Sequence, residues 1–255
     1  MKRGIVLTVF FVFGIIGCFG PGRCFSEEEK GPIGWWKFDE GTGAMATDSS
    51  GQGNNGRLIG TNTSTEWVDG KIGKALCFHG NFKKGTGVKV PGMGKKYDFS
   101  KGLTVQAWIK SMDSIPRKTD GSHRQEIVSN FQVDYGPGFG LVLSIGKTGY
   151  IQFISGDKNY WKTILGVHTL ATIRDNTWYH VAATYDGSVY KIYLNGELAD
   201  TSDPDLPLLK GLDDIYIGTL GPYYPFNGII DEVKIYDYAR SHLSILREAR
   251  LEEYQ

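Results

Sequence analysis

Residues 178–196 read WYHVAATYDGSVYKIYLNG. The pairs Asp186-Gly187 and Asn195-Gly196 bracket one apolar run, and such pairs favour the tight turns of β-hairpins. The runs on either side are short and rich in β-branched and aromatic residues, which is typical of strands. This stretch therefore predicts consecutive hairpins, and an antiparallel meander rather than alternating strands and helices.

Similar short apolar runs recur through the chain, each of a length that indicates one strand. Because eleven strands do not fit comfortably in one flat open sheet, we expect two packed sheets. No linker or internal repeat divides the body, so we expect one domain. The predicted strands lie at residues 34–39, 75–78, 87–90, 103–110, 126–131, 140–145, 150–155, 179–185, 189–194, 214–217 and 229–236.

One segment, residues 241–253, has helical periodicity. Leu243, Leu246, Ala249 and Arg250 fall on one stripe, and Ser241 can cap the first turn. We expect this helix to pack on the edge of the sandwich. The predicted fold class is all-β, a two-sheet antiparallel jelly-roll sandwich with a short C-terminal helix.

The composition excludes several classes of protein. With 40% hydrophobic and 13% aromatic residues, the chain is too apolar to be disordered. The 28 basic and 28 acidic residues cancel, and they form no basic cluster of the kind that binds nucleic acid. Cys77 is the one cysteine in the body of the chain, and its apolar neighbours indicate a buried position in a strand.

The N-terminal 26 residues predict a signal peptide. A basic start is followed at residues 4–16 by an apolar run that is short for a membrane-spanning helix. Two kinds of processing stay open: residues 15–18 resemble a lipobox that would lipidate Cys18, and residues 24–26 offer small residues before a cleavage site. We expect a linker at 27–33, the jelly-roll domain at 34–248 and a tail at 249–255. The expected location is secreted or cell envelope, with membrane contact only through a lipid at Cys18.

The order and spacing of eight short motifs carry a family resemblance. Together they resemble the LamG-like jelly-roll family, within the concanavalin A-like lectin/glucanase superfamily, over about residues 34–247. The resemblance implies a two-sheet antiparallel jelly roll, commonly extracellular and often tied to glycan or surface recognition. The motifs are WKFDEG (36–41), DSSG (48–51), NNG (54–56), GKAL (73–76), LTVQAWI (103–109), WYHVAATYDG (178–187), LNG (194–196) and NGIIDEVKIY (227–236).

The resemblance also makes a structural calcium ion plausible. Calcium prefers carboxylate, amide and carbonyl oxygens, often from loops. The candidate ligands are Asp39, Asp48 and Asp231, with Asn54 and carbonyls of the 48–56 loop completing the shell. The alternative is that these residues form turns, because Asp and Asn side chains accept hydrogen bonds from nearby backbone.

Two loops carry aromatic residues that could bind sugar. Tyr160 and Trp161 follow a polar stretch, while Tyr223 and Tyr224 lie between prolines; these four are the candidate ligand-binding residues, and Tyr135 is a weaker one. The alternative is that they cap the edge of the sandwich. A further set lies among strand-like apolar residues and is expected in the core: Trp36, Phe38, Trp108 and Trp178.

The sequence does not predict an enzyme. Glycoside hydrolysis needs two carboxyl groups at a set separation, and no Glu-x-Asp-x-Glu string places them on one strand face. Asp231 and Glu232 are adjacent and should point to opposite faces, while Arg124-Gln125-Glu126 only faintly resembles a polysaccharide-lyase strand. The leading hypothesis is an exported binding or adhesion module whose partner is a polysaccharide or glycoprotein. The alternatives are a structural surface protein with no small ligand, and a hydrolase or lyase with an unrecognised site.

Overall fold

The computed structural model describes residues 15–18, 24–27, 29–60, 65–80, 86–112, 123–130, 138–145, 149–156, 165–169, 173–202, 208, 211–220 and 224–250. The chain divides into two units, Met1–Gly31 and Pro32–Gln255. In the first unit, β1 (Ile15–Cys18) pairs antiparallel with β2 (Cys24–Glu27). The predicted signal peptide and the Cys18 lipidation stay predictions. None of the described helices has the length and apolar character needed to cross a membrane.

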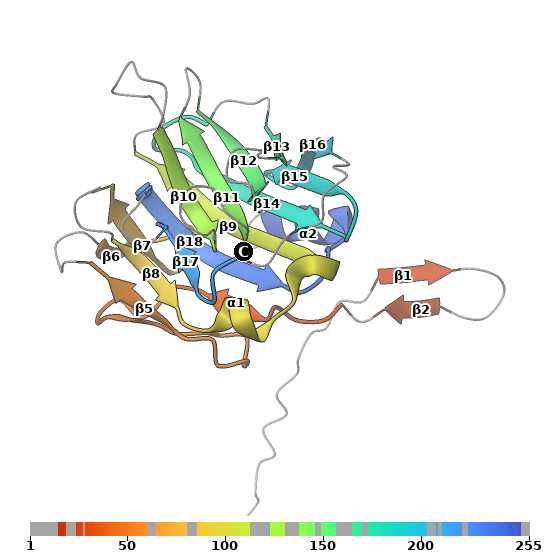
Figure 1. Ribbon diagram of the computed structural model, residues 1–255, viewed down its shortest axis with the longest axis horizontal. Helices are drawn as coiled ribbons and strands as arrows, with labels where there is room; N and C mark the ends of the chain where they lie inside the picture. The colour runs from red at the N-terminus through yellow and green to blue at the C-terminus, as the bar shows by residue number, and fades with distance from the viewer. Residues whose placement is uncertain are drawn as a thin grey trace, which may run out of the picture. The chain divides into compact units, whose positions relative to one another are not determined.

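The described part of the second unit contains two antiparallel sheets (Figure 1). We call them sheet I and sheet II. In order across sheet I lie β13 (Leu165–His168), β12 (Gly149–Gly156), β11 (Gly138–Ile145), β10 (His123–Ser129), β17 (Ile215–Ile217), β8 (Gly87–Val90), β5 (Gly56–Ile59) and β4 (Met45–Ala46). Sheet II is β16 (Glu197–Ser202), β15 (Tyr190–Leu194), β14 (Trp178–Tyr185), β9 (Leu103–Ser111), β18 (Asn227–Tyr236), β7 (Lys74–His79) and β6 (Thr65–Asp69), with β3 (Gly34–Trp36) beside β18.

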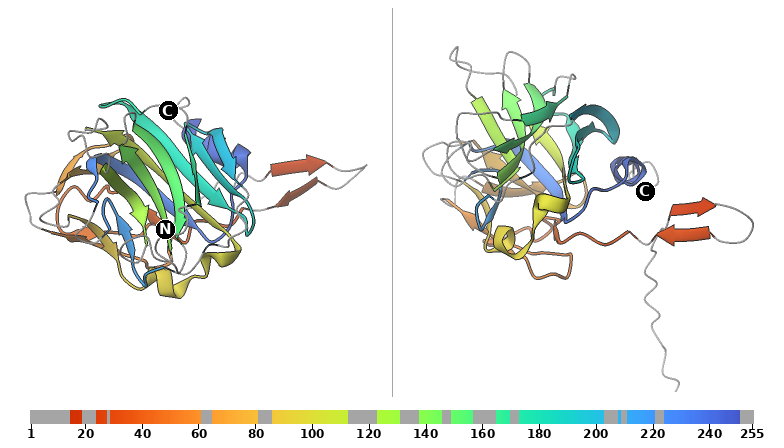
Figure 2. Two further views of the ribbon diagram at one scale, coloured as in Figure 1. Left: turned by 45° about the horizontal axis from the view of Figure 1, so that its top comes forward. Right: turned by 45° about the vertical axis from the view of Figure 1, so that its right-hand side comes forward.

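The two sheets pack face to face around a shared apolar core. Strands β10–β12 of sheet I lie over β9, β14 and β18 of sheet II (Figures 1 and 2). Alternate residues of each strand point inward, as the period of a strand requires. The core includes Leu141, Phe153 and Ile217 from sheet I, and Val105, Ile109, Val181 and Ile230 from sheet II. The predicted jelly-roll sandwich is confirmed.

Two short helical segments precede β9. Helix α1 spans Met93–Lys96, and the 3-10 helix η1 spans Phe99–Lys101. The C-terminal helix α2 spans His242–Arg250, and the Ser241 hydroxyl accepts the N–H of Ser244 at 3.1 Å, which confirms Ser241 as its cap.

The buried side of α2 differs from the predicted stripe. Ile245 is fully buried and packs on Ala182 and Tyr193 of sheet II. Leu243, which the periodicity placed on the buried stripe, is 43% exposed instead. The helix instead directs Glu248 toward the sheet, where its carboxylate contacts the buried side chains of Lys234 and Arg240. The spacing of apolar residues cannot predict such an ion pair.

The predicted core tryptophans divide between two environments. Trp36 and Phe38 are fully buried in the core between the sheets, as predicted. Trp108 is buried but lies on the outer face of sheet II, because its neighbours Ala107 and Ile109 point inward. Trp178 is only half-buried and packs with a small outer cluster that contains Cys77, so placing it in the main core was wrong. Cys77 is buried, as predicted, and burial raises the pKa of its thiol to about 11.

Candidate binding site

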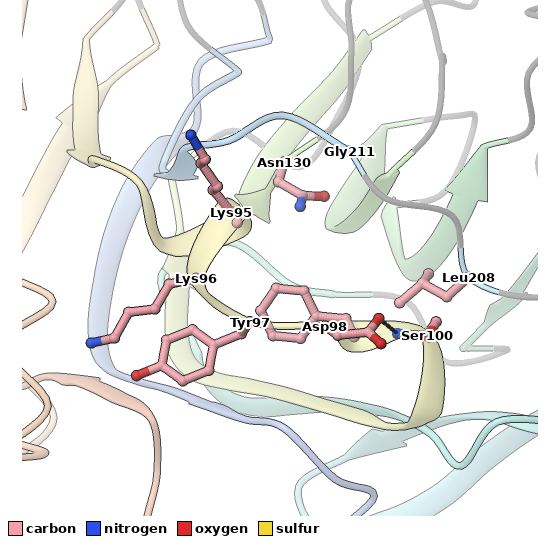
Figure 3. A pocket seen from close by; sticks show the side chains of 10 residues that line it. Lys95, Lys96, Tyr97, Asp98, Ser100, Asn130, Leu208 and Gly211 are labelled. Atoms are coloured by element: carbon pink, nitrogen blue, oxygen red, sulfur yellow. Dashed lines mark hydrogen bonds between the residues drawn. The ribbon is translucent and has the colours of Figure 1, made fainter.

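A pocket of about 220 Å³ lies between the α1–η1 segment and the end of β10 (Figure 3). Two glycines allow the backbone segments around it to come close. A Cβ on Gly211 would lie 2.2 Å from the carbonyl oxygen of Asn130, and one on Gly94 would lie 2.2 Å from that of Leu212. The side chains that line the pocket include Lys95, Tyr97, Asp98, Phe99, Asn130 and Leu208.

Asn130 closes the inner end of the pocket and is 2% exposed. Its Oδ1 accepts the N–H of Phe139 at 2.9 Å, and its backbone exchanges hydrogen bonds with Phe139 and Leu212. Because Oδ1 is committed to that N–H, the other side-chain atom must be the NH₂ group. Nδ2 points into the pocket and forms no hydrogen bond with the described residues (Figure 3). The pocket therefore has a fixed donor at its inner end.

Asp98 supplies an acceptor on the outer side. Its Oδ1 accepts the N–H of Ser100 at 3.0 Å, and this bond caps η1. Hydrogen bonds from the Ser100 side chain and backbone lower the pKa of Asp98, so the carboxylate is ionised at neutral pH. The wall beside it is apolar: Phe99 packs edge-on against Phe139 at 5.4 Å between ring centres, and Leu208 is buried.

A second apolar cluster lies next to the pocket, because two consecutive residues contribute one to each. Gly211 lines the pocket, while the next residue, Leu212, packs with Tyr224 against Ile154 and Leu220. Tyr224 is half-buried and has a positive φ of 52°, and its carbonyl accepts the N–H of Glu126 at 2.9 Å. Of the four predicted ligand-binding aromatics, Tyr224 is the one that the structure describes; Tyr160, Trp161 and Tyr223 lie outside the described residues, as does Tyr135.

The three predicted calcium ligands each hold a backbone turn. Asp48 is 8% exposed; its Oδ1 accepts the N–H groups of Trp35 and Ser50, both at 2.9 Å, and its Oδ2 accepts that of Asn54 at 2.7 Å. This arrangement agrees with the turn-forming alternative for Asp48. The nearby oxygens of Gln52 and Asn54 accept from the ammonium of Lys96, at 2.9 and 3.3 Å.

Asp39 and Asp231 lie at the turn that joins β6 to β7. Asp39 Oδ1 accepts the N–H of Lys74 at 2.8 Å, and Asp231 Oδ2 accepts those of Lys71 and Ile72 at 2.8 and 3.0 Å. The structure thus brings Asp39 and Asp231 to one turn and holds Asp48 in a different loop. Among the described residues, no three Asp, Glu, His or Cys side chains form a group that could hold a metal ion.

A bulge in β18 overturns the expectation that Asp231 and Glu232 point to opposite faces. The strand register shifts between Asp231 and Lys234, and Glu232 has a positive φ of 49°. Because Ile230 and Val233 both enter the core, the two acidic residues between them lie on the outer side. Both are buried, at 0% and 7% exposure, and Glu232 accepts the indole N–H of Trp35 at 2.6 Å. Both carboxyl groups accept hydrogen bonds from other parts of the fold, so they do not form a solvent-accessible pair of catalytic acids.

A charged cluster lies between α2 and the outer face of sheet II. Lys234 contacts Glu248 and lies 3.4 Å from Glu232, while Arg240 lies 3.3 Å from Glu248 and 3.0 Å from the Gln106 Oε1. Burial alone would raise the pKa of Glu248, but Lys234 and Arg240 hold it below its usual range. The cluster fixes the helix to the sheet.

His180 is buried next to this cluster, as a strand histidine rather than a ligand. Its ring meets Trp108 edge-on at 5.3 Å, and neither ring nitrogen has a hydrogen-bond partner among the described residues. Burial lowers the pKa of His180 to about 4, so the imidazole is neutral at physiological pH.

Several solved structures share this fold. Domain 4 of AbnA, an extracellular GH43 arabinanase from Geobacillus stearothermophilus solved with arabinotriose, is 22% identical, with a TM-score of 0.67 over 87% of this chain and 100% of that domain. The receptor-binding domain of the botulinum neurotoxin C/D mosaic serotype is 18% identical, with a TM-score of 0.65 over 88% of this chain. This chain spans about half of that toxin domain, 52%. At these identities the likeness shows a common fold.

Comparison with curated proteins finds no relative of this chain. The model of one protein family does match the chain, over residues 82–246. The matched region contains most strands of both sheets and the first half of α2. The chain belongs to the concanavalin A-like lectin/glucanases superfamily.

Proposed function

We propose that this chain is an exported, non-catalytic module that binds a glycan or a glycoprotein at the cell surface. One observation carries the proposal: the pocket combines a fixed donor, an ionised acceptor and apolar walls. It also lies beside the second apolar cluster, which Leu212 joins next to Gly211 of the pocket. Sites for small ligands combine such apolar walls with a few placed polar groups. The apolar leader at residues 4–16 supports export.

The carboxylates of the described residues support binding rather than hydrolysis. Among the described residues that line the pocket, Asp98 is the one with a carboxylate, whereas most glycoside hydrolases need two carboxyl groups about 5–9.5 Å apart. Asp231 accepts a backbone N–H of the turn between β6 and β7, and Glu232 accepts the indole N–H of Trp35. Glu126 is fully buried in β10. A lectin-type role needs no second carboxylate.

Retention of the purified chain on a glycan array tests the proposed function. We expect wild-type protein to be retained by a subset of glycans and to release no product from them. Replacing the four aromatic residues together by alanine should abolish that retention, because aromatic faces stack on sugar rings. If the variant is folded and still retained, these loops do not bind the glycan. If wild type is not retained, a structural surface protein is favoured. Release of a product would favour an enzyme. The residues are Tyr160, Trp161, Tyr223 and Tyr224.

We further propose that calcium binds the 48–56 loop in competition with the ammonium of Lys96. The loop oxygens of Gln52 and Asn54 already accept a cation, and carbonyl and amide oxygens are calcium ligands. Replacing Lys96 by alanine should therefore enlarge the rise in melting midpoint that calcium causes relative to chelator, because a ligand of the native state stabilises it. Lys95→Ala, on the same helix, is the matched control. Identical midpoints with calcium and chelator in the Lys96 variant would refute this site.

A further inference from the structure

We propose that the pocket between the α1–η1 segment and β10 takes one neutral sugar residue, at the end or on a side branch of a glycan. This inference rests on the proposed function. It specifies which part of the glycan binds and which residues bind it.

The size and closure of the pocket favour one ring over a chain. Its volume of about 220 Å³ is below the roughly 300–1,000 Å³ typical of sites for drug-sized ligands. Asn130 closes the inner end at 2% exposure, and the carbonyl oxygens of Asn130 and Leu212 lie where side chains on Gly211 and Gly94 would be. A polysaccharide therefore cannot pass through, and a terminal residue enters from the open side.

The polar groups of the pocket match sugar hydroxyls, which both donate and accept hydrogen bonds. Nδ2 of Asn130 donates from the inner end, and its direction is fixed because Oδ1 holds the Phe139 N–H. The carboxylate of Asp98 accepts from the outer side, and the Ser100 hydroxyl next to it can do either. Phe99 and Leu208 supply the apolar wall that the C–H face of a sugar ring needs.

The charges around the pocket favour a neutral residue over an acidic one. Asp98 is ionised and exposed at the mouth, so the carboxylate of a uronic acid placed beside it would be repelled. Lys96 extends away from the pocket to Gln52 and Asn54, so its charge does not offset Asp98 there (Figure 3). Lys95 remains at the rim as an exposed cation. A zwitterion such as a free amino acid is the competing occupant, because it could pair with Asp98 and Lys95 together.

Three substitutions probe the pocket and keep the backbone N–H groups that hydrogen-bond to residues 98 and 130. Ser100→Trp fills it from an exposed position. Asn130→Asp keeps the oxygen that accepts the Phe139 N–H and removes the donor, while Asp98→Asn keeps a capping oxygen and removes the charge. Thr177→Trp, an exposed residue before β14, is the matched control for added bulk.

The experiment compares retention of these variants on the array glycans that hold wild type, with their melting midpoints as a check of folding. We expect Ser100→Trp, which fills the pocket, and Asn130→Asp, which removes the donor, to lose tenfold or more in affinity. Asp98→Asn should lose several-fold, because hydrogen bonds to a charged acceptor are about twice as strong as neutral ones. Thr177→Trp should match wild type. Saturation-transfer NMR with free neutral monosaccharides, uronic acids and glycine identifies the occupant of the pocket.

The outcomes separate this inference from the proposed function. If wild type is retained and Ser100→Trp is retained equally, the pocket is not the site, although the module still binds glycans. If wild type is retained by no glycan, the proposed function fails and this inference fails with it. If uronic acids or glycine bind and Ser100→Trp abolishes that binding, the pocket is real but the proposed ligand class is wrong.

Discussion

Replacing Glu248 by alanine should lower the free energy of unfolding by about 3–5 kcal/mol, because it removes the carboxylate that two buried cations share. The side chains of Lys234 and Arg240 are 10% and 9% exposed, and both contact Glu248. Water cannot easily replace the lost carboxylate at such low exposure. Urea denaturation measures the loss as a shift in midpoint at unchanged slope.

A second ion pair of the same helix provides the control. Arg250 lies 3.0 Å from Glu197, but these side chains are 53% and 63% exposed. Replacing Glu197 by alanine should cost less than about 1 kcal/mol, since exposed ion pairs contribute little. Equal losses in the two variants would show that Glu248 does not hold a buried charge cluster.

The stability of the fold should depend on pH through two buried groups that act in opposite directions. The pKa of His180 falls from 6.5 to about 4, so the folded protein gives up a proton that the unfolded chain binds. Its contribution is complete above pH 6.5 and is lost as pH falls towards 4, on the order of 3 kcal/mol. Glu248, Lys234 and Arg240 are the charges that act on His180, and burial has the largest effect.

Asp231 should make the stability of the fold depend on pH in the opposite sense. Burial, with a further contribution from Glu232, raises the pKa of Asp231 from 3.8 to about 7, although the N–H of Ile72 opposes the shift. The folded state therefore holds a proton that the unfolded chain releases, and stability falls as pH rises from 4 to 7, on the order of 4 kcal/mol. The two dependences nearly cancel in wild type.

Single variants should separate them. Asp231→Asn leaves His180, so its stability should rise with pH between 4 and 6.5. His180→Leu leaves Asp231, so its stability should fall with pH over the same range. Urea denaturation at pH 4.5, 5.5 and 6.5 measures both slopes relative to wild type, in which all other titrating groups are the same. Parallel slopes in the two variants would refute the assignment.

The central strands could be predicted from sequence, and the edge strands could not. All eleven predicted runs overlap strands, and 87–90 matches β8 at both ends. Besides β1 and β2 of the first unit, five strands were not predicted from sequence: β4, β5, β6, β13 and β16. Four of these five lie at the ends of the two sheets. An edge strand such as β16 is largely polar because it is solvated and must resist pairing with other chains. It therefore shows no strong apolar alternation.

The sequence could not predict features that depend on pairing between distant residues. The bulge at Glu232 breaks strict alternation, and no turn residue marks it in the sequence. Asn130 meets the backbone of Leu212 only through the fold, so the pocket has no local motif. A faint signal existed in Asp98 and Ser100, whose spacing favours an N-cap, but it predicts a turn rather than a site.

A ¹H–¹⁵N NMR titration of the purified chain with the glycan that the array retains best locates the ligand on the fold. If the glycan binds in the pocket between the α1–η1 segment and β10, the amide signals of Ser100, Asn130 and Gly211 should shift in proportion to the bound fraction, together with that of Leu212. Shifts confined to the outer face of sheet II, at residues such as Trp108 and Trp178, would contradict binding in this pocket.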